Sequence, residues 1–182
     1  MNDESMNAES AGSGASHVSA APEEASPAAA ASAVSESTPP ADPDLWNLQR
    51  FVDAQRHSYA TALSEVRAGA KRSHWIWYVF PQIQGLGRSS TSQYYAITCL
   101  DEAKAYLVHP VLGPRLIRIT QAALDATAPT ATAVFGRPDD MKLRSCMTLF
   151  ALADPDQPVF DAVLAKWFGG HPDRRTLSIL GR

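Results

Sequence analysis

The chain has 182 residues, of which 16 are Lys or Arg and 19 are Asp or Glu, and this length fits one domain. Its first 41 residues hold six of the acids, no Lys or Arg and no Phe, Tyr or Trp, so the rest of the chain carries a net charge of +3. Nucleic-acid-binding proteins usually carry a dense Lys/Arg face, and a positive surplus this small does not indicate one. It is compatible with a local pocket for an anionic small molecule. We therefore expect no nucleic-acid partner.

The N-terminal segment 1–41 differs in composition from everything that follows. It consists mainly of Ala, Ser, Glu and Pro, which cannot bury enough apolar surface to offset the entropy of ordering the backbone. We predict a disordered acidic tail over 1–41 and a folded domain over 42–182. The tail has neither the basic and apolar regions of a signal peptide nor the Arg of a transit peptide. No apolar run is long enough for a membrane span, so we expect a cytoplasmic protein without a membrane partner.

The first elements are predicted to be helical. Asp44 and its neighbours can cap a helix. The apolar pattern behind them predicts one long helix or two consecutive helices, ending at Gly69. The segment 71–82, KRSHWIWYVFPQ, is apolar on all sides. A short buried helix capped by Ser73 and ended by Pro81 and a buried strand are both compatible with it. We favour the helix, because nothing else in the chain supplies convincing strand partners.

The remaining pattern repeats with the helical period and is interrupted by Pro and Gly. A glycine-bearing loop over 84–90 precedes a helix from about Ser92 to Val108, with or without a restart at Asp101. The helix starting at Pro138 is apolar on most sides, which predicts that it is central. Further helices are predicted from Pro110 to Leu124 and over 128–135, 159–168 and 173–180. These short, uneven pieces predict an all-α fold, a single irregular domain with orthogonal helix packing.

The block from Lys71 to Ser92 is the first candidate for a functional site. Aromatic walls beside a few fixed polar groups are typical of small-molecule pockets. A glycine loop with serine hydroxyls and an arginine can hold a phosphate through backbone N–H groups and guanidinium donors. The alternative is that the aromatic residues belong to the core and the glycines to a turn. The expected ligand-binding residues of this block are Trp75, Trp77, Gln82, Gly87, Arg88, Ser89 and Tyr94.

His74 is the candidate catalytic residue, because desolvation among aromatic side chains would keep its imidazole neutral for proton transfer. The alternative is a histidine satisfied within the core. His109, Lys142 and Ser145 are further candidates for ligand contacts, since a buried central helix must give its polar side chains partners or a cavity. Ser145 can also bond back to its own helix.

Metal and cofactor sites have no support in the sequence. Cys99 and Cys146 lie within apolar helical patterns and are expected to be buried free thiols. No Cys/His cluster, P-loop, dinucleotide fingerprint or nucleophile motif is present. We therefore expect no cofactor and no metal, and any catalysis would be a hydrolysis without metal.

Four segments together resemble one known family: KRSHWIWYVFPQ (71–82), GLGRS (85–89), HPVLGPRL (109–116) and DDMKLRSCMTLF (139–150). They are similar to a bacterial family of domains of unknown function, number 1810, which is sometimes labelled calpastatin, and the resemblance covers about residues 44–180. It implies a helical fold and no established activity. A looser likeness, in the stretch 106–112, links the chain to a helical family proposed to act on ADP-ribose-linked or related N-glycosidic substrates.

The leading functional hypothesis is a domain that binds or hydrolyses a phosphate-bearing, nucleotide-like small molecule, with an N-glycosidic or ADP-ribose-type substrate. The alternative is a non-catalytic interaction module or a homodimerising scaffold. The sequence leaves the oligomeric state open. The location of Trp75, Trp77 and His74 separates these hypotheses, because convergence on an open cleft favours a ligand site and enclosure in the core favours a scaffold.

Overall fold

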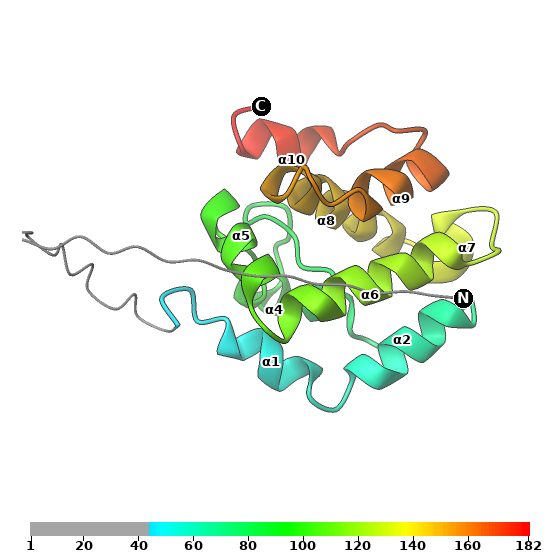
Figure 1. Ribbon diagram of the computed structural model, residues 1–182, viewed down its shortest axis with the longest axis horizontal. Helices are drawn as coiled ribbons and strands as arrows, with labels where there is room; N and C mark the ends of the chain where they lie inside the picture. The colour runs from blue at the N-terminus through cyan, green and yellow to red at the C-terminus, as the bar shows by residue number, and fades with distance from the viewer. Residues whose placement is uncertain (1–43) are drawn as a thin grey trace, which may run out of the picture. The chain divides into compact units, whose positions relative to one another are not determined.

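Short α-helices joined by loops make up the described part of the chain, residues 44–182 of a computed structural model (Figure 1). These residues belong to one compact unit, and among them no strand is formed apart from one isolated bridge. The predicted all-α domain is thus confirmed. The predicted tail over 1–41 and the domain start at 42 lie outside the described residues. The helices are α1 (Gln49–Gln55), α2 (Tyr59–Arg67), α3 (Ile76–Val79), α4 (Ser90–Tyr94), α5 (Leu100–Val108), α6 (Leu112–Asp125), α7 (Ala131–Phe135), α8 (Asp139–Ala153), α9 (Val159–Phe168) and α10 (Arg174–Ile179).

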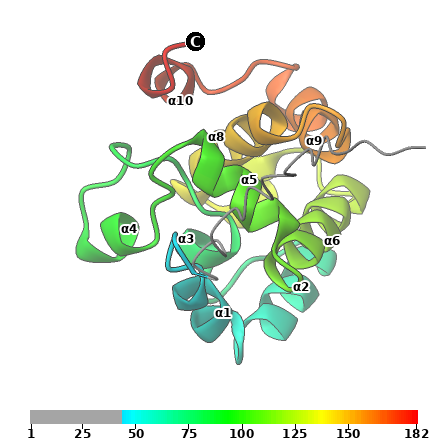
Figure 2. The same ribbon diagram turned by 60° about the vertical axis from the view of Figure 1, so that its left-hand side comes forward.

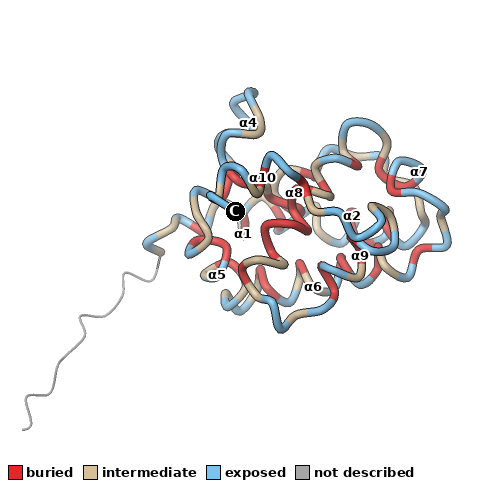
Figure 3. Tube along the Cα trace, turned by 90° about the horizontal axis from the view of Figure 1, so that it is seen from above, coloured by how far each residue is buried: buried red, intermediate tan, exposed pale blue. Residues whose placement is uncertain are grey.

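The core is built around α8, as predicted from its apolar pattern. It packs against α3, α5, α7, α9 and α10, and most of its length is buried (Figure 3). Leu143, Leu149 and Phe150 are fully enclosed. Burial of such side chains stabilises by about 2 kcal/mol each. The buried face also includes Ser145 and Thr148, whose hydroxyls need partners at this depth.

The helices cross in different directions instead of forming an up-and-down bundle, which agrees with the predicted irregular packing (Figures 1 and 2). The close approach of α5 and α6 depends on Gly113. A Cβ atom at this position would lie 1.8 Å from the carbonyl oxygen of Leu107. Only glycine therefore allows the first turn of α6 to contact the end of α5 so closely.

The N-terminal helices α1 and α2 are separate, which decides between the two alternatives for residues 42–69. Asp44 accepts a hydrogen bond from the backbone N–H of Leu48 just before α1. At the other end, Gly69 has a positive φ of 69° directly after the C-cap of α2. Glycine adopts this left-handed conformation at low cost, so the predicted stop at Gly69 is confirmed.

The segment 71–82 contains the short helix α3, so the helix predicted there is confirmed over the strand. The expected cap is wrong, because α3 begins at Ile76 without a side-chain cap. The Ser73 hydroxyl instead donates to Glu65 Oε1 of α2 at 2.6 Å. The indole Nε1 of Trp75 donates to Glu65 Oε2 at 2.8 Å. Glu65 thus fixes the chain that leads into α3.

Of the two alternatives for Ser92 to Val108, the continuous helix is wrong and the restart near Asp101 is confirmed, because α5 begins at Leu100. Ser89 caps α4 by accepting the N–H of Ser92 at 3.2 Å, but α4 ends at Tyr94. Ile97 then turns back to the main chain after α3. Its N–H donates to the Gln82 carbonyl at 2.9 Å, and its carbonyl accepts the Gln84 N–H at 2.8 Å. These two bonds form the isolated bridge between Ile83 and Ile97 and interrupt the helical pattern.

The prediction that both cysteines are buried free thiols is confirmed in part. Both cysteines of the chain are free, with Cys146 buried as expected and Cys99 only partly buried. Burial raises the pKa of the Cys146 thiol.

Within residues 44–182, no helix combines the length and the apolar character that a membrane crossing requires.

Candidate functional site

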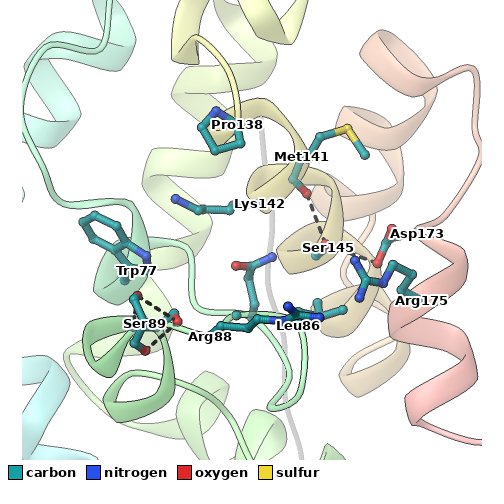
Figure 4. Close-up of a pocket in the computed structure, with 13 residues that line it drawn as sticks. Trp77, Leu86, Arg88, Ser89, Pro138, Met141, Lys142, Ser145, Asp173 and Arg175 are labelled. Atoms are coloured by element: carbon teal, nitrogen blue, oxygen red, sulfur yellow. Dashed lines mark hydrogen bonds between the residues drawn. The ribbon is translucent and has the colours of Figure 1, made fainter.

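A cleft of about 370 Å³ opens where three segments that are distant in sequence meet (Figure 4). The first runs from α3 through the glycine loop to α4, the second is the first half of α8, and the third is the start of α10. Seven of the predicted site residues line this cleft: Trp77, Gln82, Gly87, Arg88, Ser89, Lys142 and Ser145. Its other lining residues are Leu86, Ser92, Pro138, Met141, Asp173 and Arg175.

Trp77 and Lys142 form one wall of the cleft. The ammonium Nζ of Lys142 lies 4.5 Å from the centroid of the Trp77 ring. It also donates a hydrogen bond to Asp139 Oδ1 at 2.8 Å. The ring attracts the cation through its quadrupole, and the carboxylate attracts it through charge. An aromatic surface and a held positive charge therefore lie side by side at this wall.

A second lysine reinforces this arrangement from behind. Lys71, whose side chain is only 7% exposed, contacts the other oxygen of Asp139 with its Nζ at 2.7 Å. Burial tends to raise the pKa of Asp139, but the hydrogen bonds and charges of Lys142 and Lys71 outweigh it and lower the pKa. Two cations share one carboxylate, so the cluster keeps a net positive charge beside the cleft. Asp139 therefore pairs with two lysines at once.

The glycine loop supplies the facing side of the cleft. Gly87 lies against Ser92, and a Cβ atom there would lie 2.4 Å from both Cβ and Oγ of that serine. The next residue, Arg88, is exposed and has no hydrogen bond or ion pair with any residue in 44–182. A guanidinium without an internal partner is available for a ligand, and its planar fork suits a phosphate.

The C-terminal side of the cleft combines a cation with a buried carboxylate. Arg175 is exposed and, like Arg88, has no ion pair with the residues that the structure describes. Asp173 is 8% exposed and caps α10 by accepting the N–H of Thr176 at 2.9 Å. The hydroxyl of Ser145 lies 3.1 Å from the Met141 carbonyl and 3.2 Å from Asp173 Oδ2. The predicted bond of Ser145 to its own helix is thus present beside a tertiary contact.

A second cleft, of about 520 Å³, adjoins the first and shares Asp173 with it. Arg144 and Arg174 bring two further cations to its lining. Arg144 is largely engaged, since its Nε donates to the His171 carbonyl at 3.0 Å and its Nη2 to the Pro172 carbonyl at 3.3 Å. The positive character of the first cleft therefore continues past α10.

Four predicted site residues lie outside the main cleft. His74 is exposed, so the desolvation on which its proton-transfer role depended is absent. Trp75 is 1% exposed and belongs to the core, where it packs on Phe80 and Phe135. Tyr94 is 57% exposed and projects from α4. These three do not wall the cleft as expected.

His109, the fourth, has a structural role at the start of α6. Its Nδ1 accepts the backbone N–H groups of Val111 at 3.1 Å and Leu112 at 3.3 Å. These are N–H groups that a helix start otherwise leaves without a partner. His109 therefore acts as a turn and helix cap in the structure.

Sequence reasoning missed Asp173 and Arg175, because the last helix gave no signal that it returns to the glycine loop. The contact is nevertheless close, since a Cβ atom at Gly85 would lie 3.4 Å from the Ile179 side chain. The adjacent Arg174 and Arg175, next to a helix-capping Asp, were the only available cue. Ser92, Pro138 and Met141 carried no distinguishing pattern of their own.

The cleft has the chemistry of an anion site with an aromatic wall. Three cations from three segments, Arg88, Lys142 and Arg175, face one space. Serine hydroxyls and the Gln82 amide provide neutral hydrogen-bond donors and acceptors. Within residues 44–182 there is no group of three or more His, Cys, Asp or Glu side chains placed to hold a metal ion.

Comparison with known proteins agrees with this fold. No curated protein matches the chain. Among solved structures, the crystal structure of the conserved hypothetical protein Rv1873 from Mycobacterium tuberculosis is similar, with 47% identity and a TM-score of 0.75 over 76% of this chain and 99% of that one. A family model described as protein of unknown function (DUF1810) matches residues 45–180. Since this match spans most of the chain, the protein belongs to the DUF1810 family.

Proposed function

We propose that the cleft binds a phosphate-bearing, nucleotide-like small molecule. The observation that supports this most strongly is the convergence of Arg88, Lys142 and Arg175, from three distant segments, on one space beside Trp77. Arg88 and Arg175 lack partners among residues 44–182. In this proposal the guanidinium groups hold the phosphate, and the Trp77 ring contacts the planar base.

The charge of Lys142 is suited to the same ligand. Its Nζ is fixed between Asp139 and the Trp77 ring, at 2.8 Å from the carboxylate and 4.5 Å from the ring centroid. A ligand therefore meets a cation whose position is already set, which reduces the entropy lost on binding. Lys71 also pairs with Asp139. The single negative charge of this carboxylate is therefore shared between two lysines and does not fully neutralise Lys142.

Hydrolysis of an N-glycosidic bond is the reaction that we propose to test first, with ADP-ribose or a mononucleotide as substrate. The buried carboxylate of Asp173 lies at the same cleft as the proposed phosphate contacts. A carboxylate can activate water or stabilise positive charge that develops on a sugar ring. His74 is not required in this scheme, because it lies outside the cleft lining.

Thermal denaturation of the full-length protein with AMP, ADP, ADP-ribose and inorganic pyrophosphate tests the binding proposal. A ligand at one hundred times its Kd should stabilise the protein by about 3 kcal/mol and raise the Tm. Arg88→Ala and Arg175→Ala should each weaken binding about ten-fold or more, because each removes a charged hydrogen-bond donor. Arg118→Ala, on the exposed face of α6, is the matched control and should leave binding unchanged. Absence of any shift with all four compounds contradicts the proposal.

Catalysis is tested separately, by chromatography of AMP and ADP-ribose incubated with the protein. Release of free base supports a hydrolase, and binding without release supports a ligand-binding domain. If no compound binds, the interaction module or homodimerising scaffold becomes the better hypothesis, and the oligomeric state in solution is the next measurement. A cytoplasmic location remains a prediction from the sequence.

A further inference from the structure

One carboxylate oxygen of Asp173, Oδ1, makes no hydrogen bond with the described residues 44–182. Oδ2 receives all the hydrogen bonds that the structure gives to this carboxylate: from Thr176 N at 2.9 Å, Thr176 Oγ1 at 2.7 Å and Ser145 Oγ at 3.2 Å. Oδ1 accepts none from residues 44–182. It is not sealed in the core either, since Thr120 Oγ1 alone is a fully buried and unpartnered side-chain atom in that range.

The position of Oδ1 is informative because the residue is more than nine-tenths buried and lines both clefts. An ionised carboxylate is only an acceptor of hydrogen bonds. A carboxylate also repels a phosphate, so it cannot serve the anionic end of a ligand. Capping α10 requires one acceptor oxygen, which Oδ2 already supplies. The second oxygen therefore fits a donor group that enters the cleft from outside.

We infer that Asp173 Oδ1 accepts a hydrogen bond from a hydroxyl or amino group on the same molecule whose phosphate meets Arg88 and Arg175. This inference rests on the proposed function and narrows its ligand class. The ligand is a phosphorylated molecule with a hydrogen-bond donor, such as a nucleotide with a free ribose diol or an exocyclic base amine. Inorganic phosphate and pyrophosphate have no sugar hydroxyl and no base amine, so they use the cations.

The neighbourhood of Asp173 supports a polar ligand group at this end of the cleft. The Gln82 side chain is half-buried at the same cleft and makes no hydrogen bond to residues 44–182. Its amide offers both a donor and an acceptor. A sugar or base with several polar edges can therefore pair with Gln82 and Asp173 together, which an anion alone cannot do.

Asp173→Asn isolates the role of Oδ1 from that of the helix cap. The amide oxygen must remain at the Oδ2 position, because the Thr176 N–H and hydroxyl both donate there. The NH2 group then replaces Oδ1, so an acceptor in the cleft becomes a donor. Asn is also a good N-cap residue, so α10 should persist. Thr176→Val is the matched control, since it removes a hydroxyl contact to Oδ2, lies outside the cleft lining and leaves Oδ1 unchanged.

Isothermal titration of both variants and the wild type uses AMP, 2′,3′-dideoxy-AMP, IMP and inorganic pyrophosphate. Asp173→Asn should weaken AMP about ten-fold or more, as expected for loss of a charge-assisted hydrogen bond. Pyrophosphate should bind equally well or more tightly, because a repelling charge has gone. Insensitivity of dideoxy-AMP to the substitution assigns the donor to the ribose, and insensitivity of IMP assigns it to the base amine.

Two results overturn the inference in different ways. If AMP and pyrophosphate change by the same factor in Asp173→Asn, or neither changes, Oδ1 does not recognise a donor, although the proposed phosphate site stands. If the wild type binds none of the four compounds, the proposed function fails and the inference falls with it.

Discussion

Replacement of Glu65 by Gln should destabilise the protein near neutral pH and should lose this effect in acid. Glu65 accepts hydrogen bonds from the Arg72 N–H at 2.9 Å, from the Ser73 N–H and hydroxyl, and from the Trp75 indole. Burial alone would raise the pKa of Glu65, but these hydrogen bonds outweigh it and lower the pKa from 4.5 to about 2. The folded state therefore prefers the ionised carboxylate.

The size of the effect follows from that difference in pKa. A fall from 4.5 to about 2 corresponds to at most about 3 kcal/mol of stability. Glu65 is only half-buried, and water screens its interactions, so we expect about 1–2 kcal/mol. Because the folded pKa is the lower one, this contribution is complete above pH 4.5. It is lost as the pH falls from 4.5 towards 2.

Urea denaturation of wild type and Glu65→Gln at a series of pH values from 2 to 7 measures this contribution. The difference in free energy of unfolding should be about 1–2 kcal/mol at pH 7 and should vanish near pH 2, where the protonated acid and the amide are alike. Other carboxyl groups titrate equally in both proteins and cancel in the difference. A difference that stays constant across this range would refute the reasoning.

Three further substitutions and one control test other parts of the structure. Gly113→Ala should cost about 2–4 kcal/mol in thermal denaturation, because its Cβ collides with the Leu107 carbonyl; an unchanged Tm would contradict the close contact of α5 and α6. Asp139→Asn should cost about 2 kcal/mol, since it leaves a buried lysine without its charge partner, whereas Asp101→Asn, in an exposed pair, should cost less than about 0.5 kcal/mol. Gly87→Ala should weaken AMP binding about ten-fold with little change in Tm, by moving the loop that carries the cleft arginine; equal binding would contradict that role.

Much of the fold was predictable, because helical periodicity and its interruptions are local signals. Residues 139–152 are apolar on most sides of the helix, which predicted the central position of α8. Gly69 predicted the end of α2. The break between α4 and α5, which the continuous-helix alternative missed, has a nonlocal cause. The main chain at Ile97 pairs with Gln82 and Gln84, and no pattern within 92–108 reports a partner that lies more than ten residues earlier.

The candidate site was predictable in part for the same reason. The glycine loop, Trp77 and Lys142 carry unusual residue types in their own segments, and the structure brings them to one cleft. Which of two neighbouring tryptophans faces the core depends on the start of α3, one residue after Trp75. Asp173 joins the site only through packing of α10 near the loop, and such packing has no signature in one sequence.

The bridge between Ile83 and Ile97 has a consequence for hydrogen exchange. Two hydrogen bonds close the chain from 84 to 96 into a handle, whose helix α4 contains no buried residue (Figure 3). Arg50 holds the end of this handle through the carbonyls of Tyr94 and Ala96. The helix α4 itself can open locally without exposing the core, so its amides should exchange orders of magnitude faster than those of α8. The amides of Gln84 and Ile97 should be protected from exchange, because these N–H groups donate the two hydrogen bonds at the base of the handle. The arginine of the glycine loop thus lies next to a helix that can open without unfolding of the domain.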